Sequence, residues 1–152
     1  MYKVNSKKFY IKKIIILIVA FFTILFSGCG IFRKMKDGLN SSIALAEDFC
    51  IAISMDNYDL AKEYIHKDAT NGVANLKNFV SDLELSYGVK YANGVNFSRV
   101  ISANSTYLDS VYNGSVYEFT YEMTVGTKKI TMFFVVVDND ADFGIYSFGI
   151  ES

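Results

Sequence analysis

The chain has 152 residues, of which 51% are hydrophobic, so it is long enough for one folded domain and too apolar for a disordered chain. Five of its fifteen basic residues, and none of its sixteen acidic residues, precede residue 29, so the part from residue 29 onward has a net charge of −6. This charge argues against nucleic-acid binding, because contact with phosphates requires a basic surface.

The first 28 residues have the three parts that are typical of an export signal. Residues 1–13 are basic, residues 14–26 are apolar apart from Thr23, and two small residues follow. The apolar run is shorter than the about 20 residues that a permanent membrane-spanning helix needs. Basic residues ahead of it favour the export of everything that follows. We therefore predict a signal peptide over residues 1–28, with an uncleaved membrane anchor as the alternative.

The segment Phe26-Ser27-Gly28-Cys29 resembles the bacterial lipobox, although Phe26 stands where Leu is usual. The resemblance covers residues 1–30 and implies cleavage before Cys29 and attachment of a diacylglycerol to its sulfur. Two acyl chains hold a protein on a membrane where one chain is marginal. Three basic residues follow closely: Arg33, Lys34 and Lys36. They would attract anionic headgroups. We expect a lipidated tether over residues 29–38 and a location on the extracytoplasmic face of the cell membrane, held by membrane lipid through Cys29.

The rest of the chain, residues 39–152, is expected to form a single domain that begins with helices. Ser41-Ser42 offers an N-cap, and the helix after it has an apolar stripe at helical spacing: Ile43, Ala46, Phe49, Cys50 and Ile53. A second helix begins at Asp56 or Asn57 and has one apolar face: Leu60, Ala61, Tyr64 and Ile65. After a break at Asn71-Gly72, a third helix ends at Gly88 and carries Leu76, Phe79, Val80, Leu83 and Tyr87.

From Val95 onward the apolar residues recur with the period of two that is typical of strands. Gly126-Thr127 fits a two-residue type II′ turn between two of these strands, because glycine supplies the positive φ. That turn would place four apolar pairs opposite each other: Met123 and Ile130, Tyr121 and Met132, Phe119 and Phe134, Tyr117 and Val136. Further strands are expected near Val95–Ser102, running on toward residues 107–112, and at Phe143–Ile150.

One face of this hairpin is apolar and must be covered, and the helices are the available cover. The sequence therefore predicts an α+β fold in which N-terminal helices pack on a curved antiparallel sheet of about four strands. This order resembles the nuclear transport factor two-like, or cystatin-like, fold over about residues 40–152. Residues 56–64 are similar to the helix–turn–helix of small exported members. The resemblance implies helices in the concave face of the sheet and no particular activity. A different helix-on-sheet fold is the alternative.

The inward side of the predicted sheet holds the candidates for a ligand pocket. Five aromatic residues could line a small apolar pocket between helices and sheet: Tyr64, Tyr117, Tyr121, Phe119 and Phe134. The alternative is that these side chains fill the core. No inward position of the hairpin is a carboxylate or a histidine, which argues against acid–base catalysis. A register slip of one residue would instead turn Glu118 and Glu122 inward.

His66 and Cys50 are the other residues with reactive side chains. His66, the only histidine, is expected at the surface or as a cap at the end of the second helix, because one histidine cannot build a histidine-rich metal site. Cys50 lies on an apolar stripe and, with Cys29 lipidated, has no disulfide partner in the mature chain. Neither residue is predicted to be catalytic.

An alternating acidic run resembles the start of a calcium-binding loop: Asp138, Asp140 and Asp142. The sixth and twelfth positions of such a loop should be Gly and Glu, but Phe143 and Gly149 occupy them, so an EF-hand is excluded. We predict a polar hairpin loop here, with a weak calcium site as the alternative. We predict no metal site and no cofactor.

The sequence predicts a lipid-anchored binding or interaction module of the cell envelope, without catalytic activity, whose ligand is a small apolar molecule or an envelope protein. A protein-binding inhibitor or immunity-type lipoprotein, whose acidic surface neutralises a basic partner, is one alternative. An isomerase- or hydratase-like enzyme on the same fold is the second. Nucleic acid is not expected as a partner.

Overall fold

The computed structural model describes residues 36–69, 75–108 and 113–151. The chain divides into two units, residues 1–37 and residues 38–152. The predicted signal peptide, Cys29 and the break at Asn71-Gly72 lie outside the described residues. None of the helices in the described part of the chain combines the length and the apolar character that a membrane span requires.

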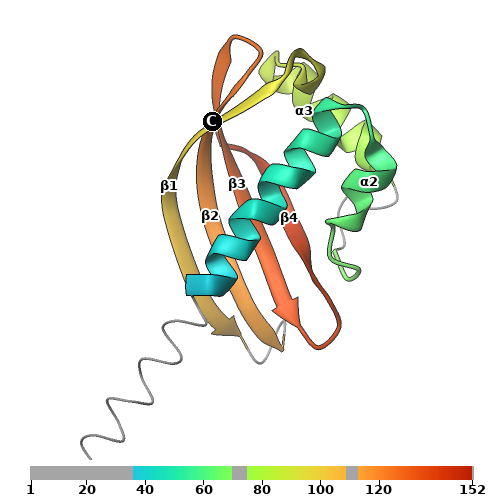
Figure 1. The fold of residues 1–152 in the computed structure, drawn as a ribbon. Coiled ribbons are helices and arrows are strands. Elements are labelled where there is room, and N and C mark those ends of the chain that lie inside the picture. Colours follow the sequence, from blue (N-terminus) through green and yellow to red (C-terminus); the bar gives the residue numbers. More distant parts are fainter. Residues whose placement is uncertain (1–35, 70–74, 109–112, 152) are drawn as a thin grey trace, which may run out of the picture. The chain divides into compact units, whose positions relative to one another are not determined.

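The helices come first in the domain, as the sequence predicts. The first helix covers residues 36–54 and is followed by α2 (Tyr58–Glu63), α3 (Leu76–Tyr87) and the short 3₁₀ helix η2 (Tyr91–Asn93). The apolar stripe of the first helix is buried except for half-buried Ile43. Figure 1 shows this helix crossing the sheet diagonally. Gly88 ends α3 in the left-handed conformation, with φ 62°, as predicted.

The predicted start of the first helix at Ser41-Ser42 is wrong, because the helix already includes residues 36–40. Ser42 is fully buried, and its hydroxyl donates a hydrogen bond of 2.8 Å to the carbonyl oxygen of Gly38, one turn earlier. A serine can satisfy its hydroxyl in this way inside a helix, so its presence does not mark a helix start.

The second helix begins where predicted, but its buried face is narrower. The side chain of Asn57 caps α2 by accepting a hydrogen bond of 3.2 Å from the amide of Leu60. Ala61 is buried, whereas Leu60 is exposed, so the prediction that Leu60 faces the core is wrong. The helix is too short to bury a wide stripe, because it ends at Glu63 and the chain then continues along the sheet.

The strands form one antiparallel sheet in the order β1-β2-β3-β4. Their bounds are Val95–Leu108, Gly114–Val125, Lys128–Asn139 and Phe143–Glu151. The predicted register between β2 and β3 is confirmed at all four apolar pairs, and Gly126 in the turn has φ 61°. Breaks in register lie between Phe97 and Arg99, between Val100 and Ser102, and between Val135 and Val136. Such bulges bend strands, and Figure 1 shows β1 bending.

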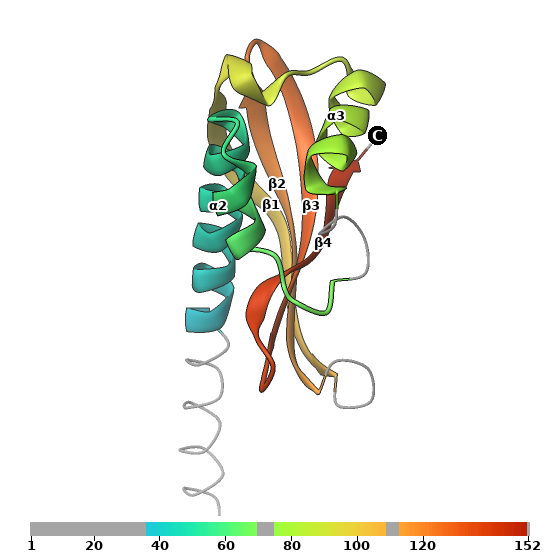
Figure 2. The same cartoon turned by 90° about the vertical axis from the view of Figure 1, so that its right-hand side faces the viewer.

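The core lies on the face of the sheet that the helices cover. The inward residues of β2 and β3 are the members of the four confirmed apolar pairs, and all of them are buried there. Figure 2 shows the first helix running along this face and α3 lying beside β4. The predicted α+β class, with N-terminal helices packed on a four-stranded antiparallel sheet, is therefore confirmed.

The segment after α2 covers the free edge of β4. Ile65 forms a parallel bridge with Ile145, in which the Ile145 amide donates to the Tyr64 carbonyl at 2.8 Å and the His66 amide donates to the Ile145 carbonyl at 2.9 Å. Gly144 permits this approach: a Cβ at that position would lie 2.5 Å from the amide nitrogen of His66. In addition, the Tyr87 hydroxyl donates to the carbonyl of Ile150 at 3.1 Å.

Candidate functional site

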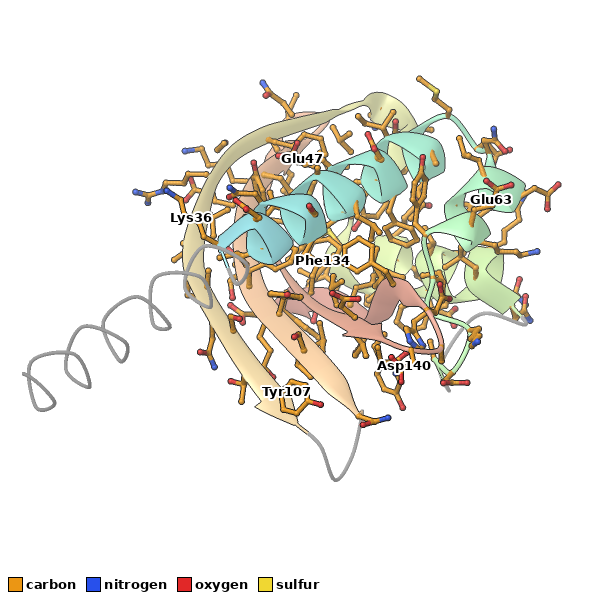
Figure 3. The ribbon with its side chains drawn as sticks, turned by 60° about the horizontal axis from the view of Figure 1, so that its bottom comes forward. Lys36, Glu47, Glu63, Tyr107, Phe134 and Asp140 are labelled. Atoms are coloured by element: carbon orange, nitrogen blue, oxygen red, sulfur yellow. The ribbon has the colours of Figure 1, made fainter. Side chains whose placement is uncertain are left out.

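Four of the five predicted pocket residues come together in the core. Tyr117, Phe119, Tyr121 and Phe134 are buried, and the rings of Phe119 and Phe134 stack with centroids 5.4 Å apart. Figure 3 shows Phe134 beneath the first helix. Tyr64 is half-buried, and it contacts β4 through its backbone carbonyl. The aromatic rings of this group pack against one another and against the helices.

Tyr117 lies against the beginning of the domain. A Cβ added to Gly38 would overlap the ring of Tyr117, with 2.5 Å to its Cζ atom. Glycine at this position therefore lets the first helix approach β2 closely enough to bury the tyrosine. This part of the interior is occupied by protein atoms.

Tyr121 is paired with a carboxylate that sequence reasoning missed. Its hydroxyl donates a hydrogen bond of 2.6 Å to Oε1 of Glu47, a half-buried residue of the first helix. The ring of Phe97 packs edge-on against the Tyr121 ring, with centroids 5.5 Å apart. Burial, then the hydrogen bond to Glu47 and the charge of that carboxylate, raises the pKa of Tyr121 to about 12. This environment holds the hydroxyl protonated at neutral pH, so Tyr121 is a hydrogen-bond donor and not a base.

His66 is buried, with 1% of its surface exposed, so its predicted place at the surface is wrong. Its Nδ1 accepts a hydrogen bond from the amide of Asp68 at 3.1 Å, which means that Nε2 carries the proton and donates to Oδ1 of Asn139 at 3.2 Å. The bridge between Ile65 and Ile145 draws His66 under the β3–β4 hairpin. Nε2 therefore joins the loop after α2 to that hairpin, whereas the hydrogen bond of Nδ1 stays within the loop.

Asp140 and Asp142 lie in the loop between β3 and β4, as predicted, whereas Asp138 belongs to β3, and Figure 3 shows Asp140 at the tip of the loop. Asn139 organises the loop by accepting hydrogen bonds from the amides of Ala141 at 2.9 Å and Asp142 at 3.0 Å. The carboxylate of Asp142 accepts from the amide of Lys67 at 3.0 Å. Within the described residues, no group of three or more His, Cys, Asp or Glu side chains could hold a metal ion.

A surface hollow of about 510 Å³ lies at the C-terminal end of α3. Its walls come from the last turns of α3, the segment that follows, and the turn between β2 and β3. The side chains that line it include Ser81, Glu84, Leu85, Val89, Lys90, Asn93, Val125, Thr127 and Lys128. None of the five aromatic candidates is among the residues that line it.

Hydrogen bonds brace the three walls of this hollow against one another. The amide of Tyr91 donates to the Glu84 carboxylate at 2.7 Å, and the amide of Gly126 donates to the Gly94 carbonyl at 2.9 Å. The ammonium group of Lys128 donates to the carbonyl oxygen of Tyr87, in the last turn of α3. The hollow is therefore built into the fold and does not depend on a ligand to form.

The signals for the missed residues were present in the sequence but weak. Glu47 lies one position after buried Ala46, so helical periodicity places it at the border of the apolar stripe. The hollow joins a helix end at Gly88 to a turn at Gly126, residues that are far apart in the chain. Only the fold brings these two glycine-containing segments together.

Comparison with known proteins found no family model, no curated protein and no solved structure that matches this chain.

Proposed function

We propose that this chain is a lipid-anchored binding module on the extracytoplasmic face of a cell membrane, without catalytic activity of its own. The basic and apolar residues before Cys29 and the resemblance of residues 26–29 to a lipobox support the anchor. The nuclear transport factor two-like, or cystatin-like, fold remains our proposal for the domain. Its support is the order of helices before a four-stranded antiparallel sheet.

The braced hollow at the end of α3 is the observation that best supports a binding role. It is a concave surface with both apolar and polar side chains, which is the usual character of ligand sites. A small apolar ligand among Tyr64, Tyr117, Tyr121, Phe119 and Phe134 has less support, because it would have to displace stacked rings from the core.

The edge of the sheet supports the second candidate, a protein-binding inhibitor or immunity-type lipoprotein. Within the described residues, no strand pairs with the outer edge of β1, which also exposes Ile101 and Tyr107. Unpaired edge strands can accept a strand from a partner protein. An isomerase- or hydratase-like enzyme has less support, because the Glu47 carboxylate and the Tyr121 hydroxyl are hydrogen-bonded to each other.

The anchor is tested by replacing each cysteine in turn in the full chain. With labelled palmitate, the wild-type protein should incorporate label and have a mass that lacks residues 1–28. Cys29→Ser should take up no label and keep those residues, whereas the matched variant Cys50→Ala should behave like the wild type. Label that persists in Cys29→Ser, or a wild-type protein that never takes up label, would refute the anchor.

A further inference from the structure

The charges at the hollow differ from those of the rest of the domain. Residues 29–152 carry a net charge of −6, yet Lys90 and Lys128 both line this one hollow. Neither lysine forms an ion pair with another described residue. An exposed cluster of unpaired ammonium groups in an acidic domain creates a local preference for anions.

The one carboxylate in the hollow is already engaged. Glu84 accepts the hydrogen bond from the Tyr91 amide, which holds its side chain toward η2. Lys128 donates to the Tyr87 carbonyl, which fixes its position and leaves further N–H donors on the same ammonium group. Hydroxyl and amide groups of Ser81, Thr127 and Asn93 complete the polar lining. The hollow thus offers more hydrogen-bond donors to an anion than its own residues use.

Apolar surface lies beside these donors. Val89 and Val125 are buried and form part of the lining. Leu85 of α3 also lines the hollow, and its side chain is 85% exposed. An exposed leucine next to a hollow is a surface that an apolar group of a ligand can cover. The combination of donors and apolar surface suits a molecule that has an anionic end and an apolar end.

We infer that the hollow is a binding site for a small organic acid, with its carboxylate at Lys90 and Lys128 and a short alkyl chain on Val89, Val125 and Leu85. This inference rests on the proposed binding function and names its ligand class. A carboxylate at two lysines gains charge-assisted hydrogen bonds, and the alkyl chain gains from burial. The braced walls lower the ordering cost of binding.

The acid is proposed to come from solution, and the hollow lies far along β2 from the start of the domain. The domain begins at Gly38, which packs against Tyr117, whereas the hollow includes the turn that follows Val125. These two points lie near opposite ends of β2, roughly 30 Å apart at about 3.3 Å per strand residue. The hollow and Gly38 are therefore near opposite ends of β2.

Octanoate serves as the probe, with the mature chain (residues 29–152) carrying Cys29→Ser so that no lipid or detergent is needed. Titration followed by amide NMR should move the signals of residues 88–93 and 126–128, and octanol and octylammonium should move them far less. Lys90→Gln should weaken octanoate binding about tenfold, whereas the matched variant Lys67→Gln, with the same charge change at a distant exposed site, should leave it unchanged. A parallel arm with vesicles containing a long-chain fatty acid, which stays in the bilayer, should show no binding, since the site takes free acid.

Signals that shift throughout the domain, equal binding of octanol, or no effect of Lys90→Gln would overturn the inference. Binding to vesicles but not to free octanoate would overturn the proposed source of the acid. The palmitate experiment on Cys29 is independent of all these outcomes. A failed octanoate titration with a confirmed anchor would therefore refute the ligand and leave the anchored module in place.

Discussion

Tyr121 joins the two layers of the domain through a single side-chain contact. The tyrosine belongs to β2 and Glu47 to the first helix, so their hydrogen bond of 2.6 Å holds the helix at the sheet near Phe97. A hydrogen bond to a charged group contributes more than one between neutral groups, because the charge strengthens the acceptor. The contact therefore contributes to stability as well as to the pKa of Tyr121.

Replacing Glu47 with Gln should lower the pKa of Tyr121. The substitution removes the charge and weakens the hydrogen bond, while the effect of burial remains, so the pKa should fall from about 12 without reaching 10.0. Titration of carbon-13 labelled tyrosine rings by NMR would measure this. Asp48→Asn, at the exposed neighbouring position, is the control and should leave Tyr121 unchanged. An unaltered Tyr121 titration in Glu47→Gln would contradict the pairing.

The raised pKa of Tyr121 also fixes the direction of a pH effect on stability. Below pH 10 the tyrosine is protonated in both folded and unfolded chains, so its contribution is fully present. Between pH 10 and about 12 the unfolded chain loses the proton first, so the free energy of unfolding falls as the pH rises through that range. The slope should be smaller in Tyr121→Phe.

At the scale of elements, Gly144 permits the contact between β4 and the segment after α2. Alanine there would place its Cβ 2.5 Å from the nitrogen and 2.7 Å from the Cα of His66, atoms of the backbone that cannot move aside. Gly144→Ala should lower the free energy of unfolding by about 3 kcal/mol and accelerate hydrogen exchange at the amides of His66 and Ile145.

A second glycine of β4 provides the control for that substitution. Alanine at Gly149 would approach the ring of Phe133, 2.6 Å from Cε1, and this half-buried side chain can rotate away. Gly149→Ala should therefore cost about 1 kcal/mol, without faster exchange at His66. Equal losses in the two variants, measured by urea unfolding, would show that the backbone approach at Gly144 is unimportant.

The elements that the sequence predicted well are those with strong local signals. The hairpin of β2 and β3 combines alternating residues with a glycine turn, and the two signals agree on one register. Elements determined by contacts distant in sequence were mispredicted. Leu60 fits the helical pattern but is exposed because α2 is short, and His66 is buried by β4, which is about 80 residues away. Local periodicity contains no information about such contacts.

At the scale of the whole domain, the hydrophobic core cluster lies on the helix-covered side of the sheet, and only Val116 and Val137 among the described hydrophobic residues of β2 and β3 are buried on the other face. Phe134 and Phe133 are neighbours on β3 and point to opposite faces: Phe134 stacks among Phe119 and Phe148, and Phe133 is half-buried on the outer face. Phe134→Ala should lower the free energy of unfolding by about 3–5 kcal/mol, and Phe133→Ala by less than half of that. Urea unfolding of both variants measures the difference, and comparable losses would refute a one-sided core.

Four of the five predicted ligand candidates are core residues, and Tyr64 is half-buried. Sequence patterning identifies side chains that point inward, but it does not distinguish a filled interior from a hollow one. Phe119 and Phe134 were correctly placed on the inner face, and the packing around them is set by the helices. The hollow near Gly88 requires the relative position of α3 and the β2–β3 turn, which only the assembled fold provides.

The burial of Cys50 has a practical consequence for following this molecule. The thiol is fully enclosed, and burial followed by the negative charge of Glu47 raises its pKa above the ordinary value, so the reactive thiolate does not form in the native domain. In a chain that carries Cys29→Ser, a thiol reagent should thus leave folded molecules untouched and react with each one only when the first helix separates from the sheet. The rate of that reaction would time the spontaneous opening of the domain under native conditions.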